Sequence, residues 1–442
     1  MPIWPVRRRW WRCGWRQKAK AFAMNREAGC AGGCKAGGQK CLECAWRAVA
    51  PLRHAAAQAT HPTAPTVSPA HALRRRALAQ ATVGIGGWAA LGATGLGTTP
   101  AWAQRMPAPS APATPITWPA ADPVLAARHQ RAFAGMAARI DAQLADVQSV
   151  VAVQRGHLAF EYYRRPGVAA DSLQDTQSVT KSVLALLFGC ALADGAVRGT
   201  NELVAPRLPD MLRISDEPRL RQLRFEHLLT MTAGWAGDQT AQRDRDDDLR
   251  QIVRRPFVAA PGARFAYDNG TANLLALALA RAVGRPLADY ARDRLFAPLG
   301  INRFDWRRGA QGHALGALGL WLPTRAMARL GELVQAEGRW AGRALLPADY
   351  VRRATERRNA GGAPLFAAYG YLWWVASTAA PRGASGRTAM ANGYGGQWIY
   401  VYPPLQLVVA ATSRRTPESM ARGQAATLIR SDILNAVRRS GA

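Results

Sequence analysis

The chain has 442 residues, of which 49% are hydrophobic and 20% charged, so it can bury a sizeable core and is not globally disordered. Its formal net charge of +29 would suit a nucleic-acid partner. However, the positive charge is spread along the chain. Residues 1–103 contain 15 basic and 2 acidic residues, and residues 104–442 contain 43 basic and 27 acidic residues. No basic run after residue 103 is interleaved with aromatic residues. We therefore expect no nucleic-acid partner. A solvated basic surface is the prediction, with weak adhesion to anionic envelope polymers as the alternative.

Residues 1–66 do not read as a folded domain, because they show no sustained helical or alternating apolar period. Five of the six cysteines lie there: Cys13, Cys30, Cys34, Cys41 and Cys44. The last four could be read as a zinc site, but the inner spacing of six residues is short for a zinc ribbon. We therefore interpret 1–66 as an unstructured leader, or as a reading frame begun too far upstream.

Residues 67–103 have the pattern of an export signal. Arg74-Arg75-Arg76 is a basic start, 77–100 is uncharged and mildly apolar, and Ala101-Trp102-Ala103 resembles a cleavage site. Translation beginning near Val67 would place this signal at the N-terminus. We predict cleavage after Ala103 and a periplasmic or secreted protein, with an uncleaved membrane anchor as the rival.

Residues 104–122 are rich in proline and alanine and are predicted to be a linker, which leaves 123–442 as the working domain. We predict no membrane span in that domain. Its first and last parts read as hairpins, at 149–163 and at 397–402 with 407–411, and a helix over 418–438 closes the chain. Strands at both ends with mostly helical sequence between them predict an α/β (α+β) fold. One antiparallel sheet would be flanked by helices, with an all-helical region inserted and the active site between the two.

Residues 178–193 are apolar nearly all round and predict a buried central helix, in which Cys190 is a small core residue. The one charge in this segment is Lys181, which is also the only lysine in 104–442, against 42 arginines. Lysine can lose its proton when it is desolvated, whereas arginine stays charged, so Lys181 is a candidate general base. Ser178 lies three residues earlier on the same helix face, at an N-terminus suited to stabilising an oxyanion. The alternative is that Ser178 only caps the helix, which would leave the lysine unexplained.

Two further elements follow this Ser-x-x-Lys pattern. Tyr267-Asp268-Asn269 supplies a Tyr-x-Asn pattern in a loop before an apolar helix at 272–283. Tyr267 could relay a proton, and Asn269 could bind Lys181 and the substrate carbonyl. Asn392-Gly-Tyr-Gly-Gly-Gln397 precedes the last hairpin, and such a glycine-rich strand edge permits close approach of a substrate. We therefore predict that Tyr394, Gly395, Gly396 and Gln397 bind substrate, with an N–H there as the second oxyanion donor.

With these elements in order, residues 130–440 resemble the serine β-lactamase-related superfamily. The similarity is to its branch around class C β-lactamases, family VIII-type esterases and 6-aminohexanoate-dimer hydrolase. Linking stretches add to the resemblance: Leu228-Leu-Thr-Met-Thr-Ala-Gly234, Pro261-Gly-Ala-Arg-Phe-Ala-Tyr-Asp-Asn269, Pro298-Leu-Gly300 and Tyr369-Gly-Tyr-Leu-Trp-Trp374. The resemblance implies a sandwich fold with a helical domain, and an acyl-enzyme on Ser178 with Lys181 and Tyr267 as proton-transfer partners.

The resemblance also implies an oxyanion hole made by the N–H groups of Ser178 and Gln397. Class C β-lactamases and DD-peptidases usually have Lys-Thr-Gly where this chain has Tyr394-Gly395-Gly396. That lysine helps to bind a substrate carboxylate. Its absence favours esters or amides that lack the carboxylate, although an arginine elsewhere could substitute.

The sequence therefore predicts a serine hydrolase that cleaves a small ester or amide without metal or cofactor. A β-lactamase or DD-peptidase is one alternative, and a non-catalytic envelope binding protein on the same fold is another. The later histidines have no metal-ligand spacing and are expected to be structural or exposed: His129, His157, His227 and His313. Contacts to substrate from Trp235 or Asp238, and an aromatic pocket wall from Trp373 and Trp374, are further possibilities. The oligomeric state stays open.

Overall fold

The computed structural model describes residues 115–237, 248–377 and 387–441. The predictions for the five early cysteines, for the export signal at 67–103 and for Asp238 lie outside these residues, as does most of the predicted linker. Within the described ranges, no helix combines the length and the apolar character needed to cross a membrane.

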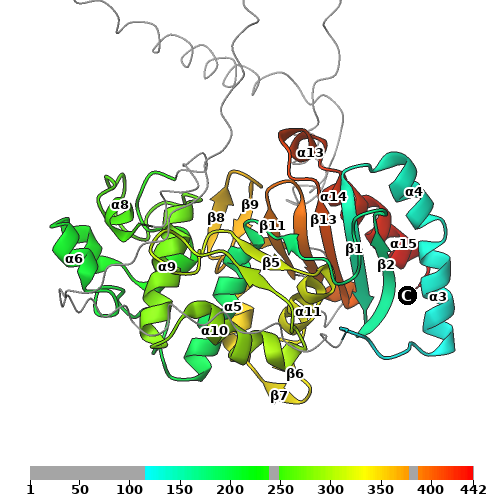
Figure 1. Ribbon diagram of the computed structural model, residues 1–442, viewed down its shortest axis with the longest axis horizontal. Helices are drawn as coiled ribbons and strands as arrows, with labels where there is room; N and C mark the ends of the chain where they lie inside the picture. The colour runs from blue at the N-terminus through cyan, green and yellow to red at the C-terminus, as the bar shows by residue number, and fades with distance from the viewer. Residues whose placement is uncertain (1–114, 238–247, 378–386, 442) are drawn as a thin grey trace, which may run out of the picture. The chain divides into compact units, whose positions relative to one another are not determined.

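One antiparallel sheet of eight strands, in the order β2-β1-β13-β12-β11-β10-β9-β8, organises the described domain (Figure 1). Its strands are β1 (Val147–Gln154), β2 (His157–Tyr163), β8 (Asn359–Gly362), β9 (Ala367–Tyr369), β10 (Trp374–Ser377), β11 (Arg387–Gly393), β12 (Gln397–Tyr402) and β13 (Leu407–Ser413). The first strand pairs with the last, Val150 opposite Ala411. The prediction of one sheet built from both ends of the domain is therefore confirmed.

Both predicted hairpins are present. β1 and β2 turn at Arg155-Gly156, where both residues have positive φ, and β12 and β13 are joined by a short turn, η5 (Pro403–Leu405). The sequence reading missed β8 to β11. Three of these strands have only three or four residues, too few to show the alternation that identifies a strand.

Successive side chains of β12 point to opposite faces of the sheet, and helices pack on both faces. Gly331 of α11 (Thr324–Gln335) packs against Ile399 and against Val408 of β13 on one face. Tyr402, an odd number of residues from Ile399 along the same strand, points to the other face and accepts a hydrogen bond from Arg438. Two layers of helices therefore bury the two faces of the sheet.

The remaining secondary structure forms the helical region, the helices around it and the small sheets. The helices are α3 (Pro123–Phe133), α4 (Met136–Gln143), α5 (Val179–Ala193), α6 (Asp210–Ile214), η2 (Pro218–Gln222), α7 (Phe225–Leu229), α8 (Leu249–Val253), α9 (Asn269–Ala282), α10 (Leu287–Ala291), η3 (Arg292–Phe296), η4 (Ala297–Leu299) and α12 (Ala348–Ala354). The small sheets comprise β3 (Gln174–Asp175), β5 (Leu320–Leu322) and β4 (Asp305–Trp306), and β6 (Arg339–Trp340) with β7 (Arg343–Ala344).

Helix α5 is the central helix that the sequence predicts, because it is buried along almost its whole length and contacts both β11 of the sheet and α9 of the helical region. Cys190 is fully buried in it, as expected for a core residue. Helix α9 begins at Asn269, three residues before the start predicted from the apolar pattern, because Asp268 caps it.

The prediction of one unbroken helix over 418–438 is wrong. The chain instead forms α13 (Pro417–Arg422), α14 (Gln424–Thr427), η6 (Leu428–Ile433) and α15 (Leu434–Arg439). Gly423 has a φ of 58° and ends α13 in the left-handed conformation, which glycine adopts without steric cost. The break turns α14 onto the end of the sheet, where Ala425 lies beside Gly396.

Candidate active site

Ser178 occupies the N-cap position of α5, but its hydroxyl does not cap the helix. The residue before it, Gln177, is buried and has a φ of 52°, a left-handed conformation that a side chain rarely adopts. Asp175 holds this turn by accepting hydrogen bonds from the backbone N–H of Gln177 at 3.0 Å and from its side-chain amide at 2.7 Å. The serine hydroxyl is therefore presented by a fixed, strained turn, and it is available for another role.

The partner of that hydroxyl is Lys181. Its side chain is 1% exposed, and its Nζ lies 3.1 Å from Ser178 Oγ. Two further oxygen atoms surround the same nitrogen, Oδ1 of Asn269 at 2.8 Å and the backbone carbonyl of Ala317 at 2.8 Å. The lysine is thus held between α5, the start of α9 and the segment that leads into β5.

Tyr267 completes this group. Its ring centroid lies 4.9 Å from Lys181 Nζ, and it shares a hydrogen bond with Ser178. Burial raises the pKa of Tyr267 to about 12, while the hydrogen bond with Ser178 acts in the opposite direction. Its ring stacks on Trp374 with centroids 5.5 Å apart. The structure therefore brings together the four predicted catalytic residues Ser178, Lys181, Tyr267 and Asn269.

Sequence reasoning gave no role to the residue between Tyr267 and Asn269. Asp268 is 1% exposed and accepts two hydrogen bonds from the guanidinium of Arg255, at 2.7 and 2.9 Å. It also accepts a hydrogen bond from the N–H of Thr271 at 2.7 Å and so caps α9. The only signal in the sequence was an acidic residue directly before an apolar helix.

The glycine-rich turn lies between β11 and β12, and its residues have different neighbours. A Cβ on Gly393 would lie 2.4 Å from the carbonyl oxygen of Thr176, so β11 approaches the turn before Ser178 as closely as a glycine allows. The N–H groups of Gly395 and Gly396 donate to Met420 Sδ and to the carbonyl of Gly393. Tyr394, which lies between Gly393 and Gly395 in the chain, is half-buried.

Gln397 pairs with Gly393 as the first residue of β12, and its buried side chain donates to the carbonyl of Ser413 at 2.8 Å. Its side-chain amide therefore supports the strand end rather than a substrate. The roles predicted for its backbone N–H and for Tyr394, Gly395 and Gly396 stay predictions.

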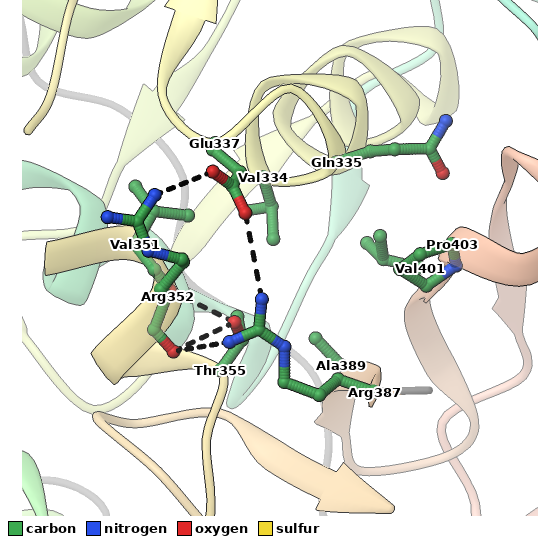
Figure 2. A pocket seen from close by; sticks show the side chains of 10 residues that line it. All are labelled: Val334, Gln335, Glu337, Val351, Arg352, Thr355, Arg387, Ala389, Val401 and Pro403. Atoms are coloured by element: carbon green, nitrogen blue, oxygen red, sulfur yellow. Dashed lines mark hydrogen bonds and ion pairs between the residues drawn. The ribbon is translucent and has the colours of Figure 1, made fainter. Parts of the chain in front are cut away.

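A cavity of about 60 Å³ lies elsewhere, between α11, α12 and the strands β11 and β12 (Figure 2). Glu337 there bridges Arg352 at 2.8 Å and Arg387 at 3.6 Å. Arg387 is the first residue of β11, whereas Gly393, beside the Ser178 turn, is the last. The two are six positions apart along the strand, roughly 20 Å, so this cavity is not part of the Ser178 site.

Three of the four later histidines make hydrogen bonds within the protein that suit a structural role. His129 is buried and hydrogen-bonded to Gln154 at 2.9 Å, and His157 contacts the carbonyl of Pro119 at 3.0 Å. His227 accepts a hydrogen bond from the N–H of Arg224 at the start of α7. In the part of the chain that the structure describes, no group of three or more metal-ligating side chains comes together.

Comparisons with known proteins agree with this fold. The model of the family described as Beta-lactamase matches residues 122–432. Among solved structures, a Bacillus anthracis protein assigned as a 6-aminohexanoate-dimer hydrolase is similar with a TM-score of 0.56 and 16% identity, covering 68% of this chain and 80% of its own. EstCE1, a hydrolase with promiscuous acyltransferase activity, is similar with a TM-score of 0.56 and 17% identity, covering 70% of this chain and 98% of its own.

A penicillin-binding protein homologue from Caulobacter crescentus is also similar, with a TM-score of 0.53 and 16% identity over 70% of this chain and 98% of its own. No curated protein sequence matches. At these identities the structural likeness shows the fold, and the predicted resemblance to the serine β-lactamase-related superfamily is confirmed.

Proposed function

This chain belongs to the beta-lactamase family, and from that premise we propose that it is a serine hydrolase that cleaves a small ester or amide through an acyl-enzyme on Ser178. The observation that carries the proposal is the 3.1 Å contact between Ser178 Oγ and Lys181 Nζ, at a serine whose hydroxyl does not cap its helix. A nucleophile within hydrogen-bond reach of a base that is itself oriented by other groups is the arrangement that covalent catalysis requires.

The partners of Lys181 suit a proton acceptor. An unprotonated amine has two N–H groups and one lone pair, and the oxygens of Asn269 and Ala317 can only accept hydrogen bonds. Donation of its N–H groups to these two oxygens would turn the lone pair of the neutral amine toward Ser178. The Ser178 proton then passes to Lys181 Nζ as Oγ forms its bond to the substrate carbonyl carbon.

Tyr267 supports the second half of this reaction. With a pKa of about 12 its phenol keeps its proton at neutral pH, so it serves as a relay rather than as the first base. The proton on Lys181 passes through Tyr267 to the leaving oxygen or nitrogen as the bond to the carbonyl carbon breaks. Water then attacks the acyl carbon and gives one proton back through the same groups to Ser178, which releases the acid.

The oxyanion would be held by the N–H of Ser178 at the positive end of α5 and by the N–H of Gln397 at the start of β12. The close approach of Gly393 to the Ser178 turn supports a location for the oxyanion beside this strand end. The chain carries no lysine after Lys181, so a carboxylate-binding lysine is missing from β11 and β12. We therefore favour substrates without a carboxylate beside the scissile bond.

A β-lactamase or DD-peptidase is the second candidate, and the family match together with the similarity to a penicillin-binding protein homologue favours it.

We further propose export to the periplasm or the medium, on the sequence pattern at 67–103 alone.

Intact-mass spectrometry of the purified protein tests these functions. The protein is exposed separately to a fluorophosphonate, to p-nitrophenyl butyrate and to a penicillin. A single adduct on Ser178 that is absent from Ser178→Ala establishes the nucleophile, and the reagent that turns over selects esterase or β-lactamase. A folded protein that forms no adduct with any reagent contradicts the proposal and favours a binding role.

A further inference from the structure

Asp268 is held from two sides. Arg255 binds both carboxylate oxygens, at 2.7 and 2.9 Å, and the first turn of α9 binds one of them through the N–H and hydroxyl of Thr271. Burial opposes the charge of this carboxylate, but the hydrogen bonds and charge of Arg255, with those of Thr271, outweigh it, and the pKa of Asp268 is lowered. The pair is therefore an ionised, bidentate ion pair in the interior.

Arg255 is itself fixed. Its guanidinium lies 4.9 Å from the ring centroid of Trp235, whose own ring packs against Phe257 at 4.9 Å. Its Nε donates to the carbonyl of Ile252 at 3.2 Å. A Cβ on Gly270 would lie 2.6 Å from the Arg255 guanidinium, so the side chain packs directly on the backbone of α9.

We propose that Arg255 is a positioning residue, which through Asp268 holds Tyr267 and Asn269 in register with Ser178 and Lys181. Tyr267 and Asn269 are the chain neighbours of Asp268, so a shift of the Asp268 backbone moves both of them. A displacement of about 1 Å in a reacting group can reduce the rate about 100-fold. This inference rests on the proposed function and adds to it a residue that touches neither the nucleophile nor the substrate.

The geometry requires an arginine at this position. A guanidinium can bind both oxygens of a carboxylate in one plane and stack on an aromatic ring, whereas an ammonium binds as a single point charge. Lysine in its place would keep the charge and lose the second hydrogen bond and the stacking on Trp235.

The test compares Arg255→Ala, Arg255→Lys and a control, Arg325→Ala, in the full chain. Arg325 forms an equally bidentate, part-buried pair with Glu161, at 3.0 and 2.8 Å, but on α11 and β2. Each variant is measured for the rate of Ser178 labelling by a fluorophosphonate and for kcat and KM on p-nitrophenyl butyrate. Arg255→Ala is measured again with guanidinium chloride well below denaturing concentrations and with methylammonium chloride.

We expect Arg255→Ala to lower kcat and the labelling rate about 10- to 100-fold with KM changed less than about threefold, and Arg255→Lys to lower them about tenfold. Guanidinium restores at least part of the Arg255→Ala loss, methylammonium restores less, and Arg325→Ala keeps the wild-type rate. Three results would overturn this inference and leave the proposed function standing. The first is a wild-type labelling rate in Arg255→Lys or Arg255→Ala. The others are a loss in Arg255→Ala that guanidinium does not relieve, and an equal loss in Arg325→Ala. Absence of labelling in the wild-type protein would overturn the proposed function, and the inference with it.

Discussion

The carbonyl oxygen of Ala317 lies 2.8 Å from Lys181 Nζ, although 136 residues separate the two in the chain. Asn273 of α9 holds the same residue, because its side-chain oxygen accepts a hydrogen bond from the N–H of Ala317 at 2.9 Å. Helix α9 therefore contacts Lys181 directly through Asn269, and it also holds residue Ala317, whose carbonyl contacts the lysine. The lysine is thus confined by backbone as well as by side chains.

Lys181→Arg is expected to remove turnover although it keeps the positive charge. A guanidinium cannot give up its proton in a protein, and a general base contributes about 100- to 10,000-fold. We expect kcat on p-nitrophenyl butyrate to fall at least about 100-fold. Lys181 is 1% exposed, so the larger arginine could also disturb the packing around it. Lys181→Met is therefore measured as a second variant, which is neutral and of similar length to lysine. A folded variant of either kind that turns over at the wild-type rate contradicts the role of Lys181.

Gly316→Ala is expected to displace the Ala317 carbonyl. A Cβ at Gly316 would lie 2.3 Å from the carbonyl oxygen of Ala272, so either the 315–318 segment or α9 must move. We expect a loss of about 1–3 kcal/mol in the free energy of unfolding, measured in urea, and a lower kcat.

Gly199→Ala is the matched control, because a Cβ there would meet nothing within 4 Å. It should leave both the free energy of unfolding and kcat close to the wild-type values. Equal behaviour of the two alanine variants would show that the contact between Gly316 and α9 is not as close as the structure has it.

The Ser178 and Lys181 pair could be predicted from the sequence because both residues lie on one helix, where a spacing of three sets their proximity. Lys181 was conspicuous as the single lysine among 42 arginines after residue 103. Tyr267 and Asn269 could be placed only through the order of motifs in a known family, since nothing local brings α9 to α5.

The supporting residues could not be predicted. Arg255 is one of many arginines, and its distinction is the tertiary contact with a buried carboxylate. Ala317 acts through its backbone carbonyl, which every residue possesses, so residue type gives no signal. The break at Gly423 was visible as a glycine, but apolar residues on both sides continued the helical period across it.

Tyr267→Phe is expected to separate proton relay from packing. The phenyl ring keeps the stacking on Trp374 and the position over Lys181 Nζ, and only the hydroxyl near Ser178 is lost. We expect kcat to fall about 100-fold with little change in KM, because the hydroxyl acts on the proton in flight rather than on bound substrate. The comparison uses p-nitrophenyl butyrate and an anilide of the same acid. The anilide should lose more, since its amine leaving group depends more strongly on protonation, and an equal or smaller loss for the anilide would contradict the relay.

Alkaline titration provides a test of burial at the same residue. The pKa of Tyr267 is raised to about 12, while an exposed tyrosine in the unfolded chain has a pKa near 10. Between these values the unfolded chain loses the phenolic proton first, so the stability contributed by the neutral phenol is full below pH 10 and is lost as the pH rises through 12. For a fully buried side chain the difference amounts to about 2–3 kcal/mol.

Urea unfolding at pH 9, 10.5 and 11.5 measures this contribution. The wild-type protein should lose stability steeply across the series, because the pKa values of Tyr162 and Tyr371 are also raised to about 12. Tyr267→Phe has no phenol to ionise at this position and should lose less over the same interval. Parallel curves for the two proteins would mean that the hydroxyl of Tyr267 titrates in the folded state as it does in water, and that burial does not raise its pKa in solution.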